Sequence, residues 1–442
     1  MNVHAPPPSN PARRDSDRPE VAPVQPPNSV NSPPEPHPSH TSSRGLDWFV
    51  FFVADVQTGF GPFVSVYLTT QKWTQIDIGF VLSIGSIVAL LGQMPGGIVV
   101  DWARSERLVA GIALTMITAA ALAYALFPIF PIVFAAATLH AMASCVLGPC
   151  IVALSLGLAG YSGIGERLGR NARFASIGNG IAAAAMGACG YYFSAHAVFF
   201  VTAALLVPTL YALSRIQPRE VDPALAHGED IVAKEPRVSF HSVLRQRRLF
   251  ILAGCIGLFH LANASMLPVM ASAVTTRSGD WATVLIAACI VVPQAIVALI
   301  SPWVGHQAQA WGRRYFVVAA FTALLARGLL FVIVTDPAAL VAVQALDGIA
   351  AASLGVMVPL MVADISRGTG HFNFAQGIVG TAVGIGASIS PTLAGYLSDT
   401  YGSPVAFLGL AIVAAVGLLT VWMILPETRP MDAAPSAVTA PH

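Results

Sequence analysis

Long apolar stretches alternate with short polar connections along most of this chain. About 20 consecutive apolar residues are enough to cross a bilayer as a helix. A hydrophobic window therefore predicts an all-α polytopic membrane protein with twelve membrane-spanning helices. The predicted spans are residues 46–70, 76–100, 108–127, 131–158, 172–193, 195–214, 249–272, 281–303, 314–335, 337–362, 372–397 and 402–425.

Polar segments divide this chain into parts. Residues 1–43 are rich in proline, serine and charge, and this composition predicts a disordered tail. Residues 215–248 form a polar central loop that separates six spans from six. We therefore expect a six-helix bundle over 44–214, a second bundle over 249–426, and a C-terminal tail over 427–442.

Composition narrows the class of protein. Of the 442 residues, 55% are hydrophobic and 10% are charged, and the mean hydropathy is +0.69. Because a soluble domain carries about 25% charged residues, a soluble enzyme, a nucleic-acid-binding protein and a secreted disulfide scaffold are excluded. The five cysteines lie in apolar stretches and are expected to be buried free thiols.

The distribution of cations predicts the orientation. Twenty of the 23 Lys and Arg residues fall on one side of the predicted spans, and only Lys72 and Arg277 fall on the other. Cytoplasmic loops of membrane proteins carry such an excess of positive charge. We expect a multi-pass protein of the plasma (inner) membrane with both tails and the central loop in the cytoplasm.

The two halves of the chain repeat each other at an offset near 207 residues. At that offset Leu139-His140 aligns with Leu346-Asp347, and Pro95 aligns with Pro302. Repeated halves are a common architecture of secondary transporters. Connections after the second and eighth spans also carry related motifs, GIVVDWARSER from Gly97 and GHQAQAWGRR from Gly305.

With these features the sequence resembles the major facilitator superfamily over residues 44–426. Each copy of the family's Gly-x-x-x-Asp-Arg-x-Gly-Arg-Arg motif is partial: the first keeps Gly97 and Asp101, and in the second Gln309 replaces the acid. The resemblance implies two helical bundles around a central cavity that work by alternating access. It also implies a gate at these connections, and we assign gating roles to Gly97, Asp101, Arg104, Gly312, Arg313 and Arg314.

Ionisable residues inside spans are costly, so they are candidates for transport. Away from span ends these are Asp55, His140, His260, Arg327 and Asp347. In the family that this chain resembles, the first, fourth, seventh and tenth spans line the cavity. Four of the five residues lie on those spans, one on each.

Each of these residues has an expected role. Arg327 and Asp347 are equally far from the turn near Pro337, and we predict that they form an ion pair. Asp55 is then the mid-depth acid left without an obvious partner, and it is our first candidate for proton coupling. His140 and His260 either relay protons, hold an anionic substrate group or are packing residues. Further candidates to line the cavity are Gln57, Asn179, Asn263, Gln294 and Gln344.

The sequence thus favours a proton-coupled secondary transporter of a small molecule, with efflux of an amphipathic compound slightly ahead of uptake. The alternative within transport is uptake of an organic acid, with Arg327 or a histidine holding its carboxylate. A membrane enzyme and a non-transporting receptor are remoter alternatives. We expect a monomer that binds substrate, proton and lipid, with no nucleic acid and no cofactor. We also expect no metal site, because no local metal-ligand spacing occurs in the sequence.

Overall fold

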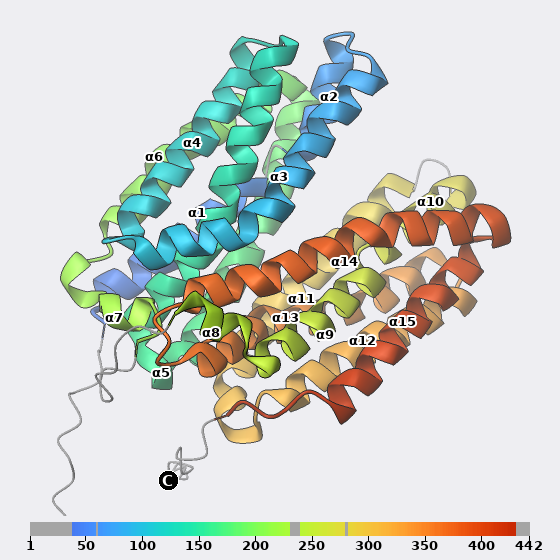
Figure 1. The fold of residues 1–442 in the computed structure, drawn as a ribbon. Coiled ribbons are helices and arrows are strands. Elements are labelled where there is room, and N and C mark those ends of the chain that lie inside the picture. The colour runs from blue at the N-terminus through green and yellow to red at the C-terminus, as the bar shows by residue number, and fades with distance from the viewer. Residues whose placement is uncertain (1–37, 59–60, 230–238, 279–281, 430–442) are drawn as a thin grey trace, which may run out of the picture. The chain divides into compact units, whose positions relative to one another are not determined.

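The computed structural model describes residues 38–58, 61–229, 239–278 and 282–429, and within these ranges the regular structure is helical. All described residues belong to one compact unit, whose helices are shown in chain order in Figure 1. Their bounds are α1 His40–Thr58, α2 Gly61–Thr70, α3 Gln75–Trp102, α4 Glu106–Leu126, α5 Phe130–Tyr192, α6 Ala195–Ser214, η1 Pro218–Glu220, α7 Pro223–Ala226, α8 Phe240–Leu244, α9 Arg247–Asn263, α10 Met266–Ser278, α11 Ala282–Trp311, α12 Arg314–Ile333, α13 Pro337–Ser366, α14 Phe372–Tyr401 and α15 Ser403–Met423.

Ten segments of the described chain are helices long and apolar enough to cross a membrane. One of them, Phe130–Gly190, holds the fourth and fifth predicted spans. The first predicted span corresponds to α1 and α2, on either side of residues 59–60, which lie outside the described ranges. The helices are therefore consistent with the twelve predicted spans.

The connection between the fourth and fifth spans is shorter than expected. α5 consists of two helices that meet at a kink at Gly160, with φ 65° and ψ 177°, so the break follows the predicted fourth span directly and residues 161–171, expected as a loop, are helical. Glycine adopts this conformation readily because it has no Cβ. The arginines that suggested a polar loop, Arg167, Arg170 and Arg173, are therefore helical residues.

The two polar segments also contain helices. Most of the predicted tail, residues 1–37, lies outside the described ranges, as does 430–442, but residues 40–43 are the first turn of α1. The Ser39 hydroxyl accepts a hydrogen bond from the Ser42 amide at 3.2 Å, which caps this turn. The central loop holds η1, α7 and α8.

Two hydrophobic clusters form the core. One contains buried side chains between Leu46 and Ala226, and the other contains mostly residues between Val243 and Leu425. The N-terminal helices (α1–α6) meet the C-terminal helices (α9–α15) mainly where α3 packs on α14 and α5 packs on α11, and the first of these pairs is visible in Figure 1.

Glycines make these helix contacts close. A Cβ on Gly97 of α3 would lie 2.1 Å from the Asn373 carbonyl oxygen, and one on Gly305 of α11 would lie 2.2 Å from the Gly165 carbonyl oxygen. Any larger residue at either position would push the two helices apart.

Candidate functional site

The ion pair predicted between Arg327 of α12 and Asp347 of α13 is present. The two side chains differ in solvent exposure: Arg327 is 2% exposed and Asp347 is 26% exposed. The same guanidinium donates a hydrogen bond to the Asn263 amide oxygen and lies 3.2 Å from the Met266 sulfur. One buried arginine thus joins α12 and α13 to the end of α9 and the start of α10.

The helix is interrupted at this point. α9 ends at Asn263 and α10 begins at Met266, within the stretch where the sequence predicts a single seventh span. The Ser390 hydroxyl of α14 accepts a hydrogen bond from the Ser265 amide at 3.2 Å and donates one to the Ser265 hydroxyl at 2.9 Å. In transporters, interrupted helices with polar neighbours form substrate and ion sites.

The other predicted site residues are more scattered. His260 lies one turn before Ala264, and its Nδ1 is 3.0 Å from the Ile256 carbonyl oxygen. Gln344, one turn before Asp347 on α13, is buried, and its Oε1 has no hydrogen-bond partner among the described residues. Asn263 is therefore the predicted cavity residue that the structure brings into contact with the ion pair.

On the N-terminal helices the predicted residues form no comparable described cluster. The Gln57 amide donates to the Ser144 carbonyl oxygen at 3.3 Å, which joins α1 to α5. His140 and Asn179 of α5 are half-buried, as is Gln294 on α11 of the C-terminal half. The backbone of Asp55 is helical, but its side chain lies outside the described part of the chain.

The predicted gating residues lie at one end of the helices, those of the first motif copy where α3 ends and α14 begins and those of the second copy where α11 ends and α12 begins. We call this the basic end, because the loops there carry most of the arginines. Asp101 is fully buried and accepts hydrogen bonds from the amides of Asn373 (3.0 Å) and Phe374 (2.8 Å) and from the Asn373 side chain (2.9 Å). The carboxylate therefore caps the N-terminus of α14 from the opposite half of the chain, where the helix dipole favours negative charge.

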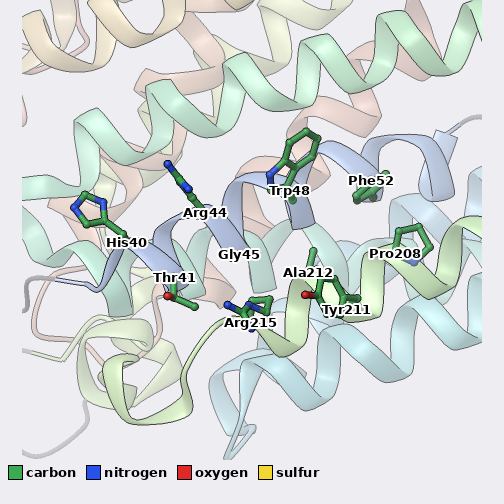
Figure 2. A pocket seen from close by; sticks show the side chains of 10 residues that line it. All are labelled: His40, Thr41, Arg44, Gly45, Trp48, Phe52, Pro208, Tyr211, Ala212 and Arg215. Atoms are coloured by element: carbon green, nitrogen blue, oxygen red, sulfur yellow. The ribbon is translucent and has the colours of Figure 1, made fainter.

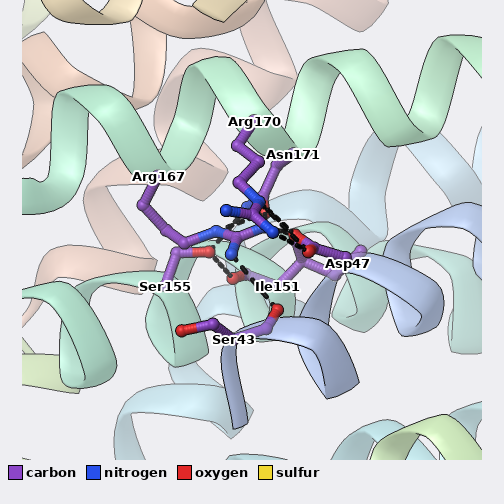
Figure 3. Close-up of polar contacts among 7 residues, drawn as sticks. All are labelled: Ser43, Asp47, Ile151, Ser155, Arg167, Arg170 and Asn171. Atoms are coloured by element: carbon purple, nitrogen blue, oxygen red, sulfur yellow. Dashed lines mark hydrogen bonds and ion pairs between the residues drawn. The ribbon is translucent and has the colours of Figure 1, made fainter. Parts of the chain in front are cut away.

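A second carboxylate at the basic end was not predicted from the sequence. Asp47 of α1 is 1% exposed and forms ion pairs with Arg167 and Arg170 of α5 (Figure 3). Asn171 extends the network, because its side-chain oxygen accepts from Arg167 at 2.9 Å and its amide donates to Ser155 at 2.7 Å. The sequence signal was the spacing of the two arginines, three residues apart and so on one helix face.

The second motif copy binds a different set of acids. Arg313 is 1% exposed and donates to the Asp364 carboxylate at 3.2 Å. Glu427 accepts from the backbone amides of Arg313 (2.8 Å) and Arg314 (3.1 Å). Gly312 precedes them with φ 90°, a conformation that favours glycine. Arg104, the remaining predicted gating residue, is exposed.

The central loop contacts both halves of the chain at the basic end. His227 Nε2 lies 3.2 Å from a Glu106 carboxylate oxygen at the start of α4, and both side chains are buried. The His227 carbonyl accepts from the Phe372 amide at 3.1 Å, and the Gly228 carbonyl accepts from the Gly368 amide at 2.7 Å. Nothing in the charge pattern of this loop predicted that it would pack between the helices.

One further acid fixes the loop to the start of α1. Glu220 accepts hydrogen bonds from the Ser39 amide (3.0 Å) and the Ser39 hydroxyl (2.9 Å). Hydrogen bonding from Ser42, and then from Ser39, lowers the pKa of Glu220 below its ordinary value. The carboxylate is therefore the form that the folded loop favours.

Comparison with known proteins places this architecture. The sequence model of the Major Facilitator Superfamily matches residues 48–305 and 258–441. An uncharacterized MFS-type transporter of Mycobacterium tuberculosis is 38% identical over 397 residues, which cover 88% of this chain and 94% of that protein.

Solved structures agree in fold at low identity. The Escherichia coli fucose:proton symporter has a TM-score of 0.68 at 15% identity, covering 85% of this chain and 97% of that one. The human organic anion transporter MFSD10 has a TM-score of 0.66 at 15% identity, covering 87% and 100%. The helices, the two partial motifs and the match along most of its length together show that this chain belongs to the Major Facilitator Superfamily of membrane transporters.

Proposed function

We propose that this protein is a proton-coupled antiporter that exports amphipathic cations or weak bases by alternating access. The observation that carries the proposal is the unequal access of the two partners in the buried ion pair: Asp347 is 26% exposed, whereas Arg327 is 2% exposed. The accessible charge at the interrupted helix is therefore negative. Such a carboxylate binds either a proton or a substrate cation, and competition between the two is the basis of antiport.

Protonation of Asp347 also has a mechanical consequence. The neutral acid would leave Arg327 buried without a counter-ion, and breaking a buried pair in this way costs about 3–5 kcal/mol. The arginine contacts Asn263 and Met266 on either side of the helix interruption. Movement of α9 and α10 that relieves this cost would couple proton binding to a change of conformation.

The N-terminal half would supply the second group of residues. Asp55 lies about nine residues into the first predicted span, and we retain it as a candidate coupling residue on that ground. His140 is a candidate to pass protons or to contact substrate. We propose that Gln57 and Asn179 of this half line the substrate path, together with Gln294 of α11 and Gln344 of α13 in the C-terminal half.

Alternating access would use the basic end as one gate. Here Asp101 caps α14, and Arg173 of α5 donates to the Ala298 carbonyl of α11 at 2.9 Å. We propose that this end faces the cytoplasm of a cell whose plasma membrane holds the protein, since the excess of arginine there follows the positive-inside rule. The contacts between the halves would break when substrate enters from the cytoplasm.

The proposal is tested by proton flux in inside-out vesicles. An imposed pH gradient is challenged with lipophilic cations, weak acids and neutral compounds, in wild type and in Asp347→Asn. We expect a cation to dissipate the gradient in wild type and to have no effect in Asp347→Asn. The matched control is Asp399→Asn, which removes an exposed acid from α14 and should keep the response.

Other outcomes reassign the role. A cation response that survives Asp347→Asn and disappears in Asp55→Asn would keep antiport and move the coupling site to α1. A gradient that no compound dissipates would overturn proton antiport.

A second candidate function, uptake of an organic acid, has one observation in its favour. Arg327 Nε is buried and has no hydrogen-bond partner among the described residues. A substrate carboxylate could accept from this group once Asp347 is protonated. This alternative predicts that weak acids, added to right-side-out cells, drive proton entry together with substrate.

A further inference from the structure

A groove of about 540 Å³ lies between the start of α1 and the end of α6, at the basic end (Figure 2). It is separate from the interrupted helix and from the gate contacts described above. Its lining residues are His40, Thr41, Arg44, Gly45, Trp48, Phe52, Pro208, Tyr211, Ala212 and Arg215.

The groove runs along the line where α1 and α6 pack closely against each other. A Cβ on Gly45 would lie 3.0 Å from the Arg215 Cβ and 3.1 Å from the Ala212 carbonyl oxygen. Arg44, the residue next to Gly45, and Arg215 both line the same end of the groove. In the sequence, both arginines count toward the positive-inside pattern and neither is a predicted site residue.

The groove changes from cationic to apolar along its length. On α1, Arg44, Trp48 and Phe52 are four residues apart and share one face, so the apolar rings lie about 6 and 12 Å further along the axis than the arginine. Tyr211 and Pro208 follow Arg215 in the same direction on antiparallel α6. Figure 2 shows this order, with His40, Arg44 and Arg215 toward one end and Phe52 and Pro208 toward the other.

The cations at the head of the groove are uncompensated. Arg44 and Arg215 are both exposed, and among the described residues no carboxylate forms an ion pair with either. The nearest acid along α1, Asp47, is held by Arg167 and Arg170 of α5. Two uncompensated cations at the same end of one groove favour an anion bound there.

The apolar part is open and rigid. Trp48 and Tyr211 are 49% and 66% exposed, as is typical of aromatic residues at the level of lipid headgroups. Ring contacts with Phe51, at 5.3 Å between centroids, and Phe174, at 6.1 Å, hold Trp48 in place. An acyl chain lying along this wall would meet a preformed surface.

We infer that this groove binds one anionic phospholipid of the leaflet at the basic end. Its phosphate would lie between Arg44 and Arg215, its glycerol backbone beside Thr41 and Trp48, and an acyl chain along Phe52 and Pro208. The charge of the groove selects the headgroup and its apolar half selects a lipid over a soluble anion. The inference rests on the membrane location of the family and is independent of proton coupling.

Quenching of Trp48 fluorescence tests the site in nanodiscs. The probes are phosphatidylglycerol and phosphatidylcholine with brominated acyl chains, and the Trp48 signal is the difference between wild type and Trp48→Phe. We expect brominated phosphatidylglycerol to quench Trp48 at a roughly 30-fold lower mole fraction than brominated phosphatidylcholine. This factor assumes that each of the two arginines attracts the anionic headgroup by about 1 kcal/mol. The preference should be lost in Arg44→Gln/Arg215→Gln and kept in Arg44→Lys/Arg215→Lys.

Two controls keep the test specific. Arg245→Gln/Arg248→Gln removes the same charge from exposed positions at the basic end and should leave the preference intact. Thermal unfolding matched to wild type shows that each variant is folded. Equal quenching by the two lipids, loss of the preference in the Arg245/Arg248 control, or displacement of the lipid by millimolar glycerol phosphate would overturn the assignment.

Discussion

The contact between α3 and α14 depends on the carboxylate of one residue, Asp101. It accepts from the Asn373 and Phe374 amides at 3.0 and 2.8 Å, and it is fully buried. In Asp101→Asn an amide NH₂ would face one of these N–H donors. Because a buried donor without an acceptor costs about 1–3 kcal/mol, we expect the population with the basic end closed to fall roughly 5- to 150-fold relative to the open one.

Spin labels at Leu108 and Tyr315, exposed on the two halves near the basic end, measure this shift as a longer distance in a background without native cysteines. Asp77→Asn is the matched control, because Asp77 lies at the other end of α3, where its hydrogen bonds among the described residues go to its own cap, Thr74. An unchanged distance distribution in Asp101→Asn would show that the cap does not hold the gate.

For the Arg327–Asp347 pair we expect effects on stability and on transport that can be separated by mutation. Asp347→Leu alone should lower thermal stability by about 3–5 kcal/mol, since it leaves a buried arginine unpaired. Arg327→Met/Asp347→Leu removes both charges and should recover most of that loss, while proton-coupled transport stays absent. Thermal unfolding in detergent and vesicle flux measure the two effects, and a double variant as unstable as Asp347→Leu would contradict the account of the pair as a balanced buried charge.

At the scale of elements, hydropathy predicted where the apolar helices lie. It could not predict that a helix extends through a polar segment. The three arginines of α5 indicated a loop, because a window registers polarity and cannot register that Asp47 neutralises Arg167 and Arg170 from another helix. The ion pair of Arg327 was predictable from matching depth on adjacent spans. Its contact with Asn263 was not, because the facing of a helix does not follow from one sequence.

The interruption between α9 and α10 should depend on Ser390 of α14. Its hydroxyl accepts from the Ser265 amide at 3.2 Å and donates to the Ser265 hydroxyl at 2.9 Å. A double-mutant cycle of Ser265→Ala and Ser390→Ala should give a coupling energy of about 0.5–1.5 kcal/mol. Ser388→Ala is the control on α14, since that hydroxyl donates only within its own helix, to the Gly384 carbonyl at 2.7 Å, and its effect should add to that of Ser265→Ala.

At the scale of the whole molecule, three separate sets of contacts hold the halves together at the basic end. α14 is capped from α3, α5 packs on α11 through paired glycines, and the central loop hydrogen-bonds to both sides. The six-plus-six pattern and the repeat predicted two related halves, and the partial motifs predicted a gate between them. They could not predict the central loop's share, since the bonds that the His227 and Gly228 carbonyls accept from Phe372 and Gly368 are backbone hydrogen bonds, which carry no residue signature.

A cross-link between the halves tests whether this end must open for transport. Gln309 Nε2 of α11 donates to the Ser162 carbonyl of α5 at 3.2 Å, so Ser162→Cys/Gln309→Cys places one thiol on each side of a contact between the halves. We expect oxidation to stop transport in vesicles, reduction to restore it, and substrate binding from the opposite side to persist while the link is intact. Gln309→Cys alone should transport under both conditions. Continued transport by the oxidised double variant would mean that the halves do not separate here, and alternating access would then need a gate other than the Asp101 contact.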